Sequence, residues 1–365
     1  MEEDSIFREL PRLSSDDGLR HAATILADSS YWRTLCPWLH VGDADVRKRF
    51  ADSVFVPSAD LVDECRDRME ADGYWTIASD DTDEATGASS LPWAVDIAGL
   101  AKAVTTLVSR GWPPNFLLVY DEAWLLVHQL RSLVLLTSGN RLSLDFSVFH
   151  VVAGTAGWPP HRDRGGETTS AFRRDGTPQY VTTWVALSEA TTTNSCLHVV
   201  SKRHDPGYGG GADRASMGEY LAAGGTSVGA ILGRGGERAL QHIRALPCAA
   251  GSLVQFSHRL LHWGSASDDG PAAVWRPQPP RVALSFASTD EAFEKPFLTH
   301  ETSGLPLPPL ETRVALVSAL AFAYSEQAPS TPKRRELFWA VVSANAAAFD
   351  PTFYAMLQQR AGTAK

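Results

Sequence analysis

The stretch Gly157-Trp-Pro-Pro-His161-Arg-Asp163 follows a predicted strand that ends near Val152. His161 and Asp163 are two positions apart, and on or beside a strand such residues project to the same face. An imidazole and a carboxylate on one face provide two of the three ligands of a facial metal site. This is the only His-x-Asp in a chain with 11 histidines, and it falls at a strand end, where sites are commonly built. The motif therefore predicts a metal site whose third ligand comes from elsewhere in the chain.

A histidine about a hundred residues later is the candidate for that ligand. The stretch Ala250-Gly-Ser-Leu-Val-Gln-Phe-Ser-His258-Arg-Leu-Leu-His262-Trp-Gly-Ser265 reads as a glycine turn, an apolar strand and a histidine followed by small residues. His258 is the alternative, but the neighbouring Arg259 indicates a surface position, so His262 is preferred. Further along, Arg281 opens a predicted strand, and from there a guanidinium can reach the same cavity and bind a carboxylate through two nitrogens.

The rest of the chain has helical patterns at both ends and strand-like patterns between them. Helical spacing covers residues 58–73, 95–109, 115–137 and 310–361. Strand-like runs rich in Val, Leu, Phe and Trp cover residues 74–77, 141–152, 179–187, 196–200, 251–256 and 281–287. The order of helices, strands and helices predicts an α+β fold, mainly β, with a barrel or double-sheet core that helices buttress at both ends.

The 365 residues are expected to form a single domain, because no segment has the composition of a linker. Residues 1–54 are predicted to be a helical N-terminal extension, residues 55–300 the core, and residues 301–365 the C-terminal helices. Within the core, residues 205–244 are rich in Gly, Ala and Arg and too long for a hairpin turn. Such an insertion is typical of a lid or functional loop.

Composition disfavours two classes of partner. The chain has 33 Lys and Arg against 42 Asp and Glu, a net charge of −9, and no basic block, so neither nucleic acid nor an anionic membrane is an expected partner. The apolar residues 116–136 are interrupted by charges, which indicates a buried helix and not a membrane span. The 4 cysteines are scattered without a C-x-x-C pair, which disfavours a disulfide framework and favours a reducing, cytoplasmic location.

Taken in order, the motifs resemble the phytanoyl-CoA dioxygenase (PhyH-like) family of Fe(II)/2-oxoglutarate-dependent oxygenases over roughly residues 55–289. They are Asp72-Gly-Tyr74, Ser138-Gly139, Trp158-Pro-Pro-His-Arg-Asp163, Thr183-Trp-Val-Ala-Leu187, Asn194-Ser-Cys-Leu-His-Val-Val200, Gly251-Ser-Leu-Val-Gln-Phe256 and His262-Trp-Gly-Ser265. The resemblance implies a double-stranded β-helix, also called a jelly roll or cupin-like core, with flanking helices.

The resemblance also implies a ligand set and an activity. His161, Asp163 and His262 would bind Fe(II), and Arg281 would hold the distal carboxylate of 2-oxoglutarate. The implied enzyme uses O₂ and hydroxylates an unactivated C–H bond of a small or medium-sized metabolite, while 2-oxoglutarate is converted to succinate and CO₂; ascorbate would support activity. The carboxylate of Asp163 argues against a halogenase. The expected assembly is a monomer or homodimer.

Less specific expectations and open alternatives complete the prediction. Ser265 and Thr183 are candidates to give a hydroxyl to 2-oxoglutarate, and the candidate pocket walls are Trp158, Trp184 and Trp263. Where the family continues Pro-Gly-Ser-His, this chain has Ser201-Lys-Arg-His204, and the extra residues 268–280 leave Arg276 as a rival to Arg281. The alternative functions are a non-catalytic jelly-roll binding protein and a cupin-type metalloenzyme that does not use 2-oxoglutarate.

Overall fold

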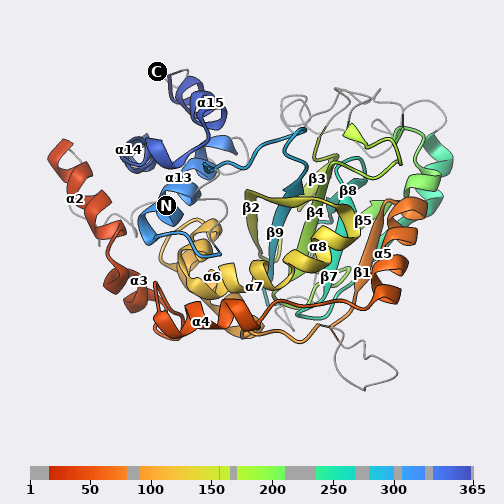
Figure 1. Cartoon of the computed structure of the whole chain (residues 1–365), viewed down its shortest axis with the longest axis horizontal. Coiled ribbons are helices and arrows are strands. Elements are labelled where there is room, and N and C mark those ends of the chain that lie inside the picture. The colour runs from red at the N-terminus through yellow and green to blue at the C-terminus, as the bar shows by residue number, and fades with distance from the viewer. Residues whose placement is uncertain are drawn as a thin grey trace.

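The computed structural model describes residues 16–79, 91–155, 157–164, 171–209, 236–267, 279–299, 306–324 and 332–362. Two antiparallel sheets lie at its centre (Figure 1). The five-stranded sheet has the order β1 (Tyr74–Ile77), β7 (Leu253–Ser257), β4 (Tyr180–Ala186), β9 (Arg281–Thr289) and β2 (Arg141–Val151). The four-stranded sheet has the order β3 (Trp158–His161), β8 (Leu261–Gly264), β5 (Leu197–Val200) and β6 (Ile243–Leu246). The predicted jelly-roll core is confirmed.

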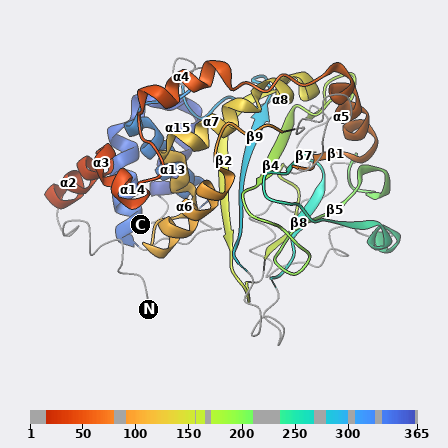
Figure 2. The same cartoon turned by 90° about the horizontal axis from the view of Figure 1, so that it is seen from below.

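Most helices from both ends of the chain gather beyond β2, at one edge of the five-stranded sheet, whereas α8 lies across this sheet and α5 packs near β1 at the other edge (Figures 1 and 2). The N-terminal group is α2 (Asp16–Leu26), α3 (Ser29–Leu35), α4 (Ala44–Asp52), α5 (Ala59–Asp72), α6 (Ile97–Ser109), η1 (Pro114–Val119), α7 (Asp121–Gln129) and α8 (Arg131–Ser138). The C-terminal group is α13 (Leu310–Ala323), α14 (Pro332–Ala344), η5 (Ala346–Ala348) and α15 (Pro351–Gly362), while the short turns η3 (Lys202–His204) and η4 (Gly236–His242) flank residues 205–235. None of the described helices has the length and apolar character to span a membrane.

Strand β4 shows why the five-stranded sheet is buried on both faces. Val181 and Val185 belong to the large apolar cluster that the sheet shares with the helices, whereas Trp184 and Ala186 belong to a second cluster with residues of β5 and β7. Because successive side chains alternate between the faces of a strand, odd positions of β4 face the helices and even positions face the other sheet.

The predicted helix over residues 58–73 is confirmed as α5. The Ser58 side chain accepts a hydrogen bond from the backbone N–H of Leu61, which satisfies one of the free donors at the helix start. Gly73 ends the helix at φ 80°, a left-handed conformation that glycine adopts without a steric penalty.

The prediction of one continuous helix over residues 115–137 is wrong. The segment is divided into η1, α7 and α8, because Tyr120 is extended, with ψ 144°, between the first two. The break places Asp121 at the start of α7, where its carboxylate accepts the backbone N–H groups of Gly42 and Asp43 and a hydrogen bond from Arg313 at 2.8 Å. A buried carboxylate needs hydrogen-bond partners, and the break between η1 and α7 brings Asp121 to these three.

Three short strands, β3, β6 and β8, were not predicted, and they form most of the four-stranded sheet. β3 contains two prolines and β8 contains a glycine, so neither has the composition typical of a strand. β6 corrects the end of the predicted insertion, because Ile243 and Arg244 pair with β5. Residues 210–235 of that insertion lie outside the described chain, as do Arg276 and most of residues 268–280.

Candidate metal centre

The three predicted ligands come together at one end of the four-stranded sheet. His161 and His262 are directly opposite each other in the β3–β8 pair. Oδ1 of Asp163 lies 3.4 Å from Nε2 of His161 and 3.5 Å from Nε2 of His262. Two atoms each about 2.1 Å from one ion and at right angles are about 3 Å apart, so the spacing fits facial coordination of a single cation.

Both imidazoles have the tautomer that a metal ligand requires. Nδ1 of His161 is 2.8 Å from the carbonyl oxygen of Pro159, and Nδ1 of His262 is 3.0 Å from that of Leu260. A carbonyl oxygen can only accept, so Nδ1 carries the hydrogen in each ring and Nε2 keeps its lone pair toward Asp163. Burial and the nearby His161 lower the pKa of His262 to about 4, so its ring is neutral at neutral pH.

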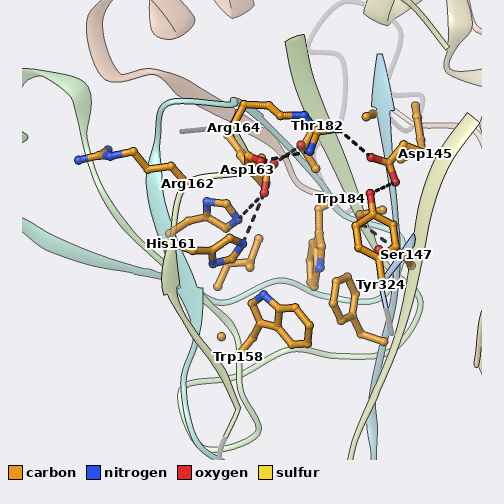
Figure 3. A pocket seen from close by; sticks show the side chains of 18 of the residues that line it. Asp145, Ser147, Trp158, His161, Arg162, Asp163, Arg164, Thr182, Trp184 and Tyr324 are labelled. Atoms are coloured by element: carbon orange, nitrogen blue, oxygen red, sulfur yellow. Dashed lines mark hydrogen bonds and ion pairs between the residues drawn. The ribbon is translucent and has the colours of Figure 1, made fainter. Parts of the chain in front are cut away.

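Thr182 holds the carboxylate of Asp163 from the other side. Its hydroxyl donates to Oδ2 of Asp163 and leaves Oδ1 facing the two imidazoles (Figure 3). Burial by itself raises the pKa of Asp163, but His262, His161 and Thr182 outweigh burial and hold that pKa well below its ordinary range. The three side chains therefore supply two neutral nitrogens and one anionic oxygen, a donor set that suits ferrous iron with open coordination positions.

Two arginines anchor the chain on either side of Asp163. Arg162 donates to both carboxylate oxygens of Asp205, at 2.5 and 2.9 Å, and the side chains of this pair are 2% and 0% exposed. Arg164 donates to both oxygens of Glu294, at 3.0 and 2.9 Å. Forked pairs of this kind restrain orientation as well as distance, so they limit movement of the segment that carries His161 and Asp163.

The triad lines a cavity of about 460 Å³ that reaches from Arg281 at one end to Asp145 and Tyr324 at the other. Trp158 and Trp184, both labelled in Figure 3, are two of its walls, and the ring centroid of Trp158 lies 6.3 Å from that of His161. An aromatic wall excludes water and strengthens electrostatic interactions inside the cavity.

Arg281 is a buried cation whose charge has no carboxylate partner among the described residues. Its side chain lies between the rings of Phe149 and Trp184, with centroids at 5.6 and 5.8 Å, and donates only to Oγ of Ser195 at 3.3 Å. Its Nε finds no hydrogen-bond partner in the described chain. Burial lowers the pKa of Arg281 to about 10, so the group is still charged at neutral pH. A buried, uncompensated guanidinium is a site for an anionic group of a ligand.

Three of the predicted pocket residues lie elsewhere. Thr183 occupies an odd position of β4, so its hydroxyl faces the helices and accepts from Gln255 at 3.1 Å. Trp263 follows His262 on β8 and points to the opposite face, where it stacks on His198 at 5.6 Å. Ser265 is not part of the cavity lining, and its buried hydroxyl has no partner in the described chain. The assignments of Thr183, Trp263 and Ser265 are therefore corrected.

His258 is not at the surface, contrary to the argument from Arg259. Both residues are buried, at 0% and 4% exposure, because Arg259 donates to the carbonyl oxygens of Gly207 and Tyr208. His258 donates through Nδ1 to the carbonyl oxygen of Tyr180 at 3.0 Å, and it is not a member of the triad.

Residues that the sequence did not reveal complete the cavity, namely Thr182, Asp145, Tyr180 and Tyr324. The position of Thr182 could have been found from the alternation of β4, because it shares a face with Trp184. Tyr324 had no sequence signal, since it lies after α13 and, apart from Ala323, far along the chain from the other cavity residues.

Comparison with known proteins gives one family and a set of similar structures. The family model described as phytanoyl-CoA dioxygenase (PhyH) matches residues 52–270. No curated protein sequence matches the chain.

Similar solved structures include the non-heme α-ketoglutarate-dependent epimerase SnoN from nogalamycin biosynthesis, at 15% identity over 64% of this chain and 84% of that one, with a TM-score of 0.38. AviO1 from Streptomyces viridochromogenes Tue57 has 16% identity over 63% of this chain and 95% of that one, with a TM-score of 0.39. EctD from S. alaskensis has 15% identity over 64% of this chain and 78% of that one, with a TM-score of 0.36.

Proposed function

The chain belongs to the phytanoyl-CoA dioxygenase family, and on that premise we propose that it is an Fe(II)- and 2-oxoglutarate-dependent oxygenase that hydroxylates an unactivated C–H bond of a small or medium-sized metabolite. One observation carries the proposal. A two-histidine, one-carboxylate cluster and an uncompensated guanidinium line the same cavity. The first is the donor set for ferrous iron, and the second is a partner for the distal carboxylate of 2-oxoglutarate.

His161, Asp163 and His262 would hold the metal, and the tautomers fixed by Pro159 and Leu260 match that role. When bound, iron together with 2-oxoglutarate and O₂ supplies the oxidising power for attack on a C–H bond. The protein contributes orientation and a dry site. Arg281 would bind and orient the co-substrate by its carboxylate, while Trp158 and Trp184 exclude water from the space between the triad and Arg281.

The test is formation of succinate from 2-oxoglutarate by the whole chain with Fe(II), O₂ and ascorbate, over a panel of metabolites. Substrate should stimulate succinate formation, and Asp163→Ala should abolish it because the ion loses the one carboxylate that the described cluster supplies. Equal turnover by the wild-type chain and Asp163→Ala would reject the proposed role of Asp163, and a non-catalytic binding protein predicts no succinate from either.

Arg281→Ala separates this proposal from a metalloenzyme that does not use 2-oxoglutarate. Loss of a charge-assisted pair costs about 1.5–3 kcal/mol, so the KM for 2-oxoglutarate should rise about 10- to 100-fold. A KM that stays unchanged would assign the co-substrate carboxylate to another group, and Arg276, which lies outside the described chain, is the next residue to replace.

A further inference from the structure

The end of the cavity opposite Arg281 holds a buried carboxylate that the proposed reaction does not use. Asp145 lies on β2, its side chain is 7% exposed, and it lines the cavity together with Ser147 of the same strand. Figure 3 shows Asp145, Ser147 and Tyr324 on one side of the cavity and the triad on the other.

Two features of the backbone and the C-terminal helices hold Asp145 in place. The pairing of β2 with β9 shifts register between Leu142 and Phe146, and within this bulge Leu144 has φ 69°. A left-handed conformation at a residue other than glycine costs about 1–2 kcal/mol and persists where the surroundings impose it, often beside a functional site. Tyr324, which follows α13, donates its hydroxyl hydrogen to Oδ1 of Asp145 at 2.5 Å.

The charges around Asp145 do not balance. Arg164 reaches Oδ2 of Asp145 at 3.4 Å, but the same guanidinium is forked onto Glu294 at 2.9 and 3.0 Å. In the described chain the single positive charge of Arg164 therefore serves two carboxylates, those of Asp145 and Glu294. Burial raises the pKa of Asp145, and Arg164 and Tyr324 only partly offset that effect.

The Tyr180 hydroxyl also donates to Oδ2 of Asp145, at 3.3 Å, but carries no charge. Arg360, which lines the same cavity, donates to the carbonyl oxygens of Phe322 and Ala323. Among the described residues, Arg164 is therefore the one cation in contact with both Asp145 and Glu294, and their second negative charge has no partner.

We propose that Asp145 binds a protonated amine of the substrate. The inference deepens the proposed function and rests on it for the claim that the amine-bearing molecule is the one oxidised. An ammonium group supplies the second positive charge and donates to Oδ1, which accepts only from the Tyr324 hydroxyl among the described residues. A hydroxyl group would satisfy Oδ1 but leave the charge unbalanced, and a carboxylate would be repelled.

The experiment compares three probes of nearly equal size: cyclohexylmethylammonium, cyclohexylmethanol and cyclohexanecarboxylate. Each is titrated by calorimetry into the whole chain loaded with Fe(II) and 2-oxoglutarate under nitrogen. The ammonium probe should bind at least tenfold more tightly than the alcohol, because it adds an ion pair to the hydrogen bond that either probe donates to the Asp145 carboxylate. Equal binding of the ammonium and the alcohol, or a preference for the carboxylate, would overturn the proposal.

Two variants and one control test whether the negative charge of Asp145 and Glu294 causes the preference for ammonium. Asp145→Asn keeps the shape and should remove the preference for ammonium while the alcohol binds as before. Glu294→Gln lies outside the cavity lining, yet it should also reduce the preference, because Arg164 is then left to neutralise Asp145 alone. Asp60→Asn removes an exposed carboxylate on α5 and should retain the wild-type preference. An unchanged preference in both Asp145→Asn and Glu294→Gln would contradict the proposal, and the second variant decides if the first does not fold.

The outcome is separable from that of the proposed function, because the titrations need no turnover. A chain that forms succinate but does not discriminate among the probes keeps the proposed function and loses this inference. A chain that prefers ammonium but never consumes 2-oxoglutarate keeps the amine site and loses the proposed function.

Discussion

Thr182 orients the carboxylate of Asp163 for metal binding. The Thr182 hydroxyl donates to Oδ2, so that Oδ1 faces the two imidazoles. Thr182→Val removes that hydrogen bond with almost no change in shape. Metal affinity should fall about 10- to 100-fold, the usual cost of losing a group that orients a ligand. Titration of the protein with Fe(II) under nitrogen measures the change.

Thr183→Val is the matched control for this prediction. The Thr183 hydroxyl faces the helices, so the variant should lose about 1 kcal/mol of stability with its Gln255 hydrogen bond but bind metal as the wild type does. A drop in metal affinity as large as that of Thr182→Val would contradict the role assigned to Thr182.

His258 should make the protein sensitive to acid. Burial lowers the pKa of His258 to about 4, against about 6.5 in an unfolded chain, so the folded state binds fewer protons than the unfolded state. His258 costs no stability above pH 6.5, where the ring is neutral in both states, and the free energy of unfolding falls as the pH drops from 6.5 toward 4; by pH 5 the loss is about 2 kcal/mol.

His258→Asn can keep a donor for the carbonyl oxygen of Tyr180 without the titrating ring. Its free energy of unfolding, measured with urea on the metal-free protein, should fall less between pH 7 and pH 5 than that of the wild type. The same fall in both proteins would show that His258 is not responsible. His262 titrates similarly but is common to the two proteins.

Among the elements, the pairing of β3 with β8 depends on one glycine. Gly157 has φ 77°, and a Cβ there would overlap the carbonyl oxygens of Gly264 and Ser265, just after His262. Gly157→Ala should therefore push apart the two strands that carry the histidines, with a loss of stability of about 2 kcal/mol or more and weaker metal binding. Thermal unfolding and Fe(II) titration report the two effects.

Gly176→Ala provides the comparison, because Gly176 also has a positive φ, 85°, but a Cβ there meets nothing within 4 Å. Only the cost of the left-handed conformation should remain, about 1 kcal/mol, with metal binding unchanged. Equal effects of the two substitutions would mean that the contact between β3 and β8 is less tight than described.

The elements also show what the sequence could predict. Runs with strong local signals, such as Ser58 and Gly73 at the ends of α5, were predicted within a residue or two because capping is a local interaction. β3 and β8 were missed because the prolines of β3 and the glycine of β8 are untypical of strands, so each is defined mainly by its partner across the sheet. Thr183 was chosen although alternation along β4 places Thr182 on the face of Trp184; which of the two faces meets the cavity is set by packing between layers.

At the scale of the whole molecule, a buried ion pair joins the C-terminal helices to the N-terminal ones. Arg313 of α13 and Asp121 of α7 are both 0% exposed and 2.8 Å apart. Asp121→Asn leaves the Arg313 charge buried without a counter-ion, so urea unfolding should show a loss of about 3–5 kcal/mol. The double variant Asp121→Asn with Arg313→Met should be more stable than Asp121→Asn alone; a double variant that is less stable would mean that the pair contributes through packing and not through charge.

The metal triad could be predicted at this scale, but the far wall of the cavity could not. His161 and Asp163 share one recognisable motif, and His262 lies in a second one. Asp145 and Tyr324 are 179 positions apart and meet because the end of α13 brings Tyr324 to β2, a long-range contact with no local pattern.

The position of β9 has a practical meaning for anyone who dissects or redesigns this protein. The segment matched by the family ends at residue 270, yet β9 is hydrogen-bonded to β4 on one side and to β2 on the other, and Tyr324 follows later still. A recombinant fragment trimmed to the matched residues would lack β9, an inner strand of the five-stranded sheet, and should aggregate. Conversely, replacing the helices after β9 with those of a relative would change Ala323, Tyr324 and Arg360 of the cavity wall but leave His161, Asp163 and His262 in place.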